Sequence, residues 1–67
     1  MAKVKYYNKA IELNPKSTVA YNNRGLVYHR LGEFKKAISD FDRAITLDPS
    51  YAIAYHNRGL SDYSLGK

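Results

Sequence analysis

The sequence predicts an all-α protein made of antiparallel helical hairpins, and two observations predict it. The stretch AYNNRGLVYHRLGE, which begins at Ala20, returns as AYHNRGLSDYSLGK, which begins at Ala54, so the two copies are separated by a shift of 34 residues. Within the repeat, apolar side chains recur at the three- and four-residue spacing that places them on one face of a helix. A repeat of this length is typical of a helical solenoid, in which each unit packs on its neighbours.

Four helices are expected, over residues 2–14, 18–31, 34–47 and 52–65. The third shows the helical spacing most clearly, because one apolar stripe collects Phe34, Ala37, Ile38, Phe41, Ala44 and Ile45.

Proline, glycine and serine predict where these helices begin and end. Pro15 and Pro49 cannot continue the helices before them, and Gly32 tolerates the positive φ that often follows a helix. Ser17 and Ser50 are expected to cap the helices that follow, since a serine hydroxyl accepts a hydrogen bond from a free backbone N–H at a helix start.

Length and composition limit the chain to one small domain without disulfide cross-links or a cysteine-based metal site. A chain of 67 residues buries a modest share of its surface, and without cysteine it has neither disulfides nor a cysteine-based zinc site. No apolar run approaches the roughly 20 residues of a membrane span, and the basic N-terminal stretch lacks a signal-peptide pattern. A cytoplasmic protein without cofactors is therefore expected. The formal charge of +5 fits an acidic partner or solubility alone.

One copy of the repeat resembles the tetratricopeptide repeat (TPR). The family pattern has a large aromatic residue, a glycine four residues later and a tyrosine three further, then alanine, an aromatic residue, a second alanine and a closing proline. The matching residues are Tyr21, Gly25, Tyr28, Ala37, Phe41, Ala44 and Pro49. Tyr21 replaces the commoner tryptophan, and Arg24 stands where leucine is usual. Small residues fall where helices must approach closely, and aromatic residues fill the space between them.

The resemblance implies a right-handed α-solenoid fragment. Each TPR has a first helix (A) and a second helix (B), and the order here is B-A-B-A. The expected division is residues 1–17 as the second half of a repeat, 18–51 as a complete repeat, and 52–67 as the first half of another.

The half-repeats are expected to associate with one another. Helix 2–14 lacks an A helix and helix 52–65 lacks a B helix, so each should expose an apolar face. Met1 corresponds to Lys35 under the shift, so a second molecule's first helix could complete the last half-repeat, in a ring, a filament or a swapped dimer. The residues expected at this contact are Lys3, Tyr7, Ala10, Ile11, Gly59, Asp62 and Leu65.

Lys3 and Asp62 would bring opposite charges together at this contact. In the family frame they replace Ala37 and Tyr28, which pack between the two helices of one repeat. An ion pair there would favour this pairing over others more than it would add affinity. The alternative is that both residues are polar because terminal helices are exposed to water.

In the TPR family, the A helices line a concave surface that holds extended peptides or partner helices. The resemblance assigns this groove to Val19, Asn22, Asn23, Leu26, His29, Arg30, Ile53, His56, Asn57, Leu60, Tyr63 and Ser64. The asparagine amides could hold a peptide backbone, since each offers a donor and an acceptor, or they could be ordinary solvated residues.

A complete clamp for a C-terminal carboxylate, which some members of the family have, is not expected. Leu26 and Leu60 occupy a position where that clamp needs asparagine. Asn22 and His56 stand where it needs lysine.

No catalytic or metal site is expected. His29 and His56 are offset along neighbouring helices by roughly 10 Å, at about 1.5 Å per residue, which is too far for one zinc ion. Asp40, Asp42 and Asp48 are expected on exposed faces near lysine and arginine. No Ser-His-Asp or Cys-His arrangement and no glycine-rich phosphate loop is suggested.

The sequence therefore predicts a protein-interaction scaffold that is not an enzyme, with a protein or peptide partner and no membrane contact. The rival from another class is nucleic-acid binding, because lysines gather on the B helices: Lys3, Lys5, Lys9, Lys16, Lys35 and Lys36. Against this rival, most tyrosines are expected at packing positions, where they cannot stack on bases: Tyr7, Tyr21, Tyr28 and Tyr55. The remaining alternative is a truncated or designed repeat fragment without a ligand.

Overall fold

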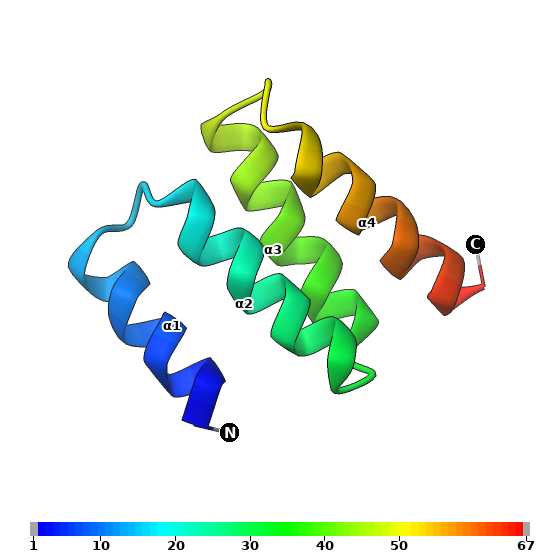
Figure 1. Cartoon of the computed structure of the whole chain (residues 1–67), viewed down its shortest axis with the longest axis horizontal. Helices are drawn as coiled ribbons and strands as arrows, with labels where there is room; N and C mark the ends of the chain where they lie inside the picture. The colour runs from blue at the N-terminus through cyan, green and yellow to red at the C-terminus, as the bar shows by residue number, and fades with distance from the viewer. Residues whose placement is uncertain (1, 67) are drawn as a thin grey trace.

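Four α-helices make up the part of the chain that the computed structural model describes, residues 2–66 (Figure 1). They are α1 (Ala2–Leu13), α2 (Thr18–Arg30), α3 (Phe34–Leu47) and α4 (Ala52–Leu65), and residues 2–66 contain no strand. The all-α fold class is confirmed, and α1 and α2 each end one residue earlier than expected. Met1 and Lys67, which bound the expected half-repeats, lie outside the described residues.

The helices pack as consecutive antiparallel neighbours. α1 lies beside α2, α2 beside α3 and α3 beside α4, in a flattened molecule whose Cα atoms span 34 × 29 × 13 Å (Figure 1). α2 and α4 also contact each other, although α3 separates them in sequence. These two helices therefore contribute to one common face, while α1 and α4 lie at the two ends of the row.

Short side chains and glycine hold the turns between the helices. The Ser17 hydroxyl accepts a hydrogen bond from the backbone N–H of Ala20 at 3.1 Å, as expected for a helix cap. Gly32 has a φ of 78°, and the N–H of Glu33 donates to the carbonyl of Tyr28 at 2.9 Å. This glycine-containing turn satisfies a carbonyl that the end of α2 would otherwise leave free.

The expectation that Ser50 caps α4 is wrong. Tyr51 precedes α4 and makes no side-chain cap, while the Ser50 hydroxyl donates to Oδ1 of Asp48 at 2.7 Å. The reason is the register, since Tyr51 and not Ser50 corresponds to Ser17 under the 34-residue shift. Asp48 and its counterpart Asn14 each accept a hydrogen bond from the backbone N–H two residues later, so both turns are stabilised by the same kind of side-chain contact.

The core centres on the contact between α2 and α3. Phe41 of α3 is fully buried and lies against Gly25 of α2. A Cβ atom on Gly25 would be 2.5 Å from Cε1 of Phe41, so the two helices can approach this closely only because Gly25 has no side chain. The other buried apolar side chains are small or of medium size: Ala20, Val27, Ala37, Ala44 and Ala54.

Asp40 is buried beside this contact, so its expected place on an exposed face is wrong. Its side chain is 1% exposed, and Arg24 donates to both carboxylate oxygens, from Nε at 2.8 Å and from Nη2 at 2.7 Å. Arg43 adds a third hydrogen bond at 2.9 Å. The hydrogen bonds to Asp40 raise the pKa of Arg24, although burial acts in the opposite direction. The carboxylate tolerates burial because these charged donors replace the water that it loses.

The same arginine also ties α1 to the rest of the molecule. Nη1 of Arg24 donates to Oδ1 of Asn8 at 2.8 Å, and Arg58 of α4 donates to Oδ1 of Asp42 at 2.7 Å. Arg58 and Asp42 correspond to Arg24 and Asn8 under the shift. The structure therefore makes one inter-repeat contact twice, once with an amide and once with a carboxylate.

The variant Arg24→Leu is expected to lower the free energy of unfolding by about 3 kcal/mol, because Asp40 would stay buried without its bidentate partner. Urea denaturation followed by circular dichroism measures the loss. The double variant Arg24→Leu/Asp40→Leu is expected to recover most of it, since an apolar pair needs no counter-ion. A double variant no more stable than Arg24→Leu would contradict this account.

Two glycines that correspond under the shift are expected to respond oppositely to alanine. Gly25→Ala should cost about 1–3 kcal/mol, because its Cβ would meet the Phe41 ring. Gly59→Ala should add up to about 1 kcal/mol, because alanine favours helix over glycine. A Cβ on Gly59 meets nothing within 4 Å. Thermal unfolding of dilute samples compares the two variants, and shifts of the same sign would count against the described packing.

Candidate protein-binding face

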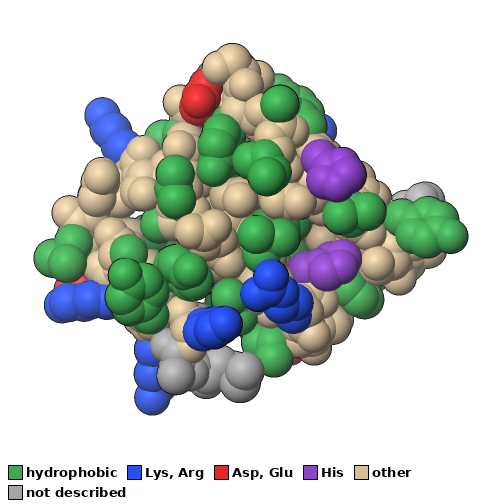
Figure 2. Space-filling model, in the orientation of Figure 1, with side chains coloured by type: hydrophobic (Ala, Val, Ile, Leu, Met, Phe, Trp, Pro, Cys, Tyr) green, Lys and Arg blue, Asp and Glu red, His purple; other side chains and the backbone are tan. Residues whose placement is uncertain are grey.

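α2 and α4 carry the residues that the sequence assigns to a groove. These helices contact each other one repeat apart, so corresponding side chains emerge next to one another. Figure 2 shows the histidines of both helices on one face of the molecule. Hydrophobic side chains lie beside both, basic side chains adjoin one of them, and acidic side chains are seen only near the margin. We refer to this surface as the α2–α4 face.

Apolar side chains form two rows across this face. Each row is a pair of residues that correspond under the shift. Val19 and Ile53 form one row and are both exposed. Leu26, which is half-buried, and Leu60, which is exposed, form the other. Tyr63, near the end of α4, is 83% exposed. Each row therefore runs from one helix to the next, across the helix axes.

The remaining accessible members of the expected groove are polar. Arg30, His56 and Ser64 are exposed, and Asn23 is half-buried. The assigned set contains no acidic residue. The face therefore combines apolar surface with the positive charge of Arg30.

Two of the assigned asparagines are buried against each other. Asn22 is 3% exposed and Asn57 is 6% exposed, and Nδ2 of Asn57 donates to Oδ1 of Asn22 at 3.0 Å. This hydrogen bond pairs the Asn57 amide nitrogen with the Asn22 amide oxygen at the contact between α2 and α4. Neither is a solvated surface residue, and neither is open to a ligand in this arrangement.

His29 forms a second polar link between the same helices. Its Nδ1 lies 2.8 Å from Oγ of Ser61, which is fully buried on α4, and its ring meets that of Phe34 edge to face at 5.1 Å. Sequence reasoning did not single out Ser61. The signal was present, because Ser61 replaces Val27 in the second copy, and a polar residue at a core position needs a partner.

The residues expected at the self-association contact lie at the two ends of the row of helices. The exposed ones are Lys3 and Gly59, and the half-buried ones are Tyr7, Ala10, Ile11, Asp62 and Leu65. One chain does not bring the α1 group and the α4 group together (Figure 1). The ion pairs found within residues 2–66 do not include Lys3 or Asp62.

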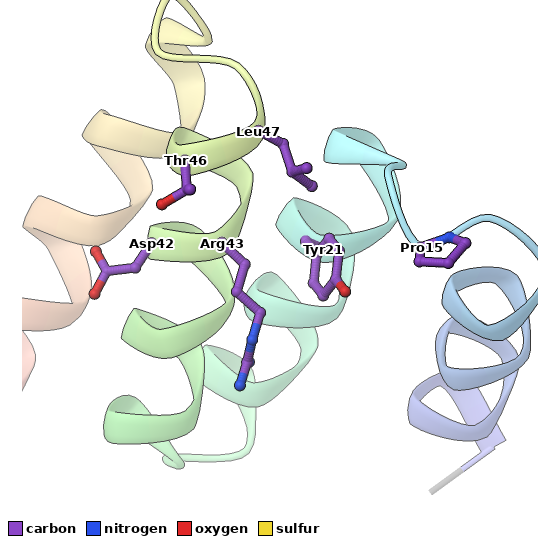
Figure 3. A pocket seen from close by; sticks show the side chains of 6 residues that line it. All are labelled: Pro15, Tyr21, Asp42, Arg43, Thr46 and Leu47. Atoms are coloured by element: carbon purple, nitrogen blue, oxygen red, sulfur yellow. The ribbon is translucent and has the colours of Figure 1, made fainter.

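A pocket of about 310 Å³ lies between α3 and the turn that joins α1 to α2 (Figure 3). Tyr21 and Leu47 point toward the space between these elements, and Asp42 turns toward α4. The charged lining residues are already paired, Asp42 with Arg58 and Arg43 with Asp40. This pocket therefore offers apolar surface and charges that are already neutralised.

Tyr55 does not occupy the packing position that the sequence predicts for it. Its side chain is exposed, and its hydroxyl donates to the carbonyl of Pro49 at 3.0 Å. Arg58 lies over its ring, with 5.4 Å between the guanidinium carbon and the ring centroid. The physical reason is that Tyr55 lies on α4, the last helix of the row, and no described helix follows α4 to cover the ring.

Residues 2–66 contain neither a candidate metal site nor a helix that could span a membrane. No group of three or more histidine, cysteine, aspartate or glutamate side chains in that range could hold a metal ion. None of the helices described there is both long enough and apolar enough to cross a bilayer.

The packing of paired antiparallel helices, repeated along the chain, defines a helical repeat protein. A family model described as tetratricopeptide repeat matches residues 18–51, just over half of the chain, and a second model with the same description matches residues 3–17. The chain belongs to the tetratricopeptide repeat family.

Curated relatives match over short segments of much longer proteins. E3 ubiquitin-protein ligase TTC3 of Mus musculus is 48% identical over 35 residues, which cover 52% of this chain and 2% of that protein. Small glutamine-rich tetratricopeptide repeat-containing protein 2 of Mycosarcoma maydis is 44% identical over 39 residues, which cover 58% of this chain and 11% of that protein.

The variant Asn57→Ala is expected to lower the free energy of unfolding by about 1–3 kcal/mol, because it leaves a buried Asn22 oxygen without a donor. The matched control is Asn23→Ala, since Asn23 corresponds to Asn57 but is half-buried, and its cost should stay below about 0.5 kcal/mol. Urea denaturation measures both. Equal losses would mean that the buried amide pair does not stabilise the fold.

Proposed function

We propose that this chain is a protein-interaction scaffold, without enzymatic activity, that binds an extended peptide across the α2–α4 face. The observation that supports this is the pair of apolar rows, which stay largely exposed between helices that two side-chain hydrogen bonds hold together. A surface ordered before binding loses little conformational entropy when a ligand arrives.

The chemistry of the face selects for a particular class of peptide. The rows of Val19 with Ile53 and of Leu26 with Leu60 would hold apolar side chains, and Arg30 would attract an acidic residue beside them. Asn23 is the accessible asparagine, so its amide would bind the peptide backbone. The favoured ligand is therefore an apolar peptide with a nearby acidic group. Ubiquitin transfer is not proposed, because the matched segment is 2% of the ligase that carries that name.

The variant Leu60→Ser is expected to weaken binding of a selected peptide about tenfold, the effect of losing about 1.4 kcal/mol of apolar contact. The peptide would come from display selection against the unmodified chain, and titration calorimetry would compare the variants. Leu47→Ser is the matched control, since Leu47 is also partly exposed but lines the pocket between α3 and the α1–α2 turn. Equal weakening by both variants would place the binding site elsewhere.

We also propose, as a second candidate function, that the chain associates with copies of itself through α1 and α4. The repeat division at 1–17, 18–51 and 52–67 supplies the frame for this proposal. Its support is the contrast between two corresponding glycines: Gly25 is covered by an aromatic ring, and Gly59 has open space over it.

A further inference from the structure

We propose that copies of this chain associate head to tail, with α1 of a second copy packed on the α4 surface formed by Gly59, Asp62 and Leu65. This inference rests on the self-association proposed above and names the contact that would carry it. We refer to this α4 surface as the Gly59 face.

The Gly59 face repeats a surface that is already filled once within the chain. On α2, Gly25 accepts the Phe41 ring of α3 so closely that a Cβ there would be 2.5 Å from the ring. On α4, a Cβ on Gly59 would meet nothing within 4 Å. The second site therefore has the same backbone opening and no ring in it.

α1 is the helix of this chain that fits such a site. It corresponds to α3 under the shift, so Tyr7 stands for Phe41 and Ala10 stands for Ala44. Phe41 and Ala44 are fully buried, whereas Tyr7 and Ala10 are only half-buried. α1 therefore keeps a packing surface beyond the one it uses against α2, and an aromatic ring lies at the position that a glycine accepts.

Charge favours a head-to-tail contact over a symmetric one. Lys3 corresponds to Ala37 and Asp62 corresponds to Tyr28, so α1 of a second copy would bring its lysine toward Asp62. A symmetric contact of α1 with α1 would oppose two lysines, and one of α4 with α4 would oppose two aspartates. Like charges at an interface select against both of those pairings.

The α2–α4 face would continue across this junction. With α1 of the second copy on α4, the second copy's α2 lies where α4 lies relative to α2 within one chain. Under the shift, His56 corresponds to Asn22 and Asn23 corresponds to Asn57. At the junction, His56 of one copy would therefore contact the second copy's Asn23, as Asn22 contacts Asn57 within one chain. Both side chains are accessible in one chain, and an imidazole can hydrogen-bond to an amide.

The junction between copies is weaker than the α2–α3 contact to which it corresponds. Tyr6 corresponds to Asp40 under the shift. Arg58 would therefore face the neutral phenol of the second copy's Tyr6, whereas Arg24 forms an ion pair with the carboxylate of Asp40. Arg58 also keeps its own partner, Asp42, within one chain. Association is therefore expected to be reversible and dependent on protein concentration.

Complementary variants test the contact. Lys3→Asp places a negative charge opposite Asp62, and Gly59→Leu fills the opening on α4. Sedimentation velocity should show that each variant alone associates at least about tenfold more weakly than the unmodified chain, a change of about 1.4 kcal/mol. Mixed one to one, the variants should form a dimer of twice 7.7 kDa and nothing larger, because the mixture contains one intact junction per pair. Lys5→Asp is the matched control, since Lys5 is an exposed lysine on α1 outside the contact.

Each other outcome overturns a distinct step. If the unmodified chain stays at 7.7 kDa at every concentration, the chain does not self-associate and the whole proposal is wrong. If the unmodified chain associates but the mixed variants do not pair, self-association stands and the head-to-tail contact is wrong. Equal weakening by Lys5→Asp and Lys3→Asp also overturns the contact, because total charge would then explain the effect. Circular dichroism of each variant verifies that it remains helical.

Discussion

The close contact of Gly25 with Phe41 sets the geometry on which the rest of this small fold depends. The ring fills the volume that a side chain on Gly25 would need, and this fixes the distance between α2 and α3. Arg24 and Asp40 each precede one of these two residues, so the same approach brings guanidinium and carboxylate together in a buried setting. Arg24 then reaches Asn8 and secures α1. A single missing Cβ therefore permits packing, ion pairing and the attachment of a third helix.

Local signals predicted the helices well and the polar contacts between them poorly. The helix starts, the Ser17 cap and the turn at Gly32 depend on residues close in sequence, and the structure confirms them, although α1 and α2 each end one residue earlier than predicted. The burial of Asp40 depends on an arginine 16 residues away, which hydropathy cannot detect. The substitution of arginine for the usual leucine at position 24 was the available clue, because a cation near the core requires a counter-ion.

The correspondence between repeats also fails to predict burial where a helix lacks a neighbour. Asn23 and Asn57 correspond in sequence, but among the described helices only Asn57 has an A helix preceding its own, and only Asn57 is buried in an amide pair. Tyr21 is half-buried and Tyr55 is exposed, because Tyr55 lies on the last described helix of the row. In a short solenoid, position in the row decides burial as much as residue type does. A candidate site on such a molecule can therefore be placed on the correct helices from sequence, while the accessible members of the site require the structure.

The contact that joins successive repeats is made once with an amide, Arg24 to Asn8, and once with a carboxylate, Arg58 to Asp42. Arg58 and Asp42 are both partly exposed, so dissolved ions screen their attraction. The hydrogen bond to Asn8 involves one neutral partner and is screened less. Rising ionic strength will therefore weaken the attachment of α4 to α3 more than that of α1 to α2.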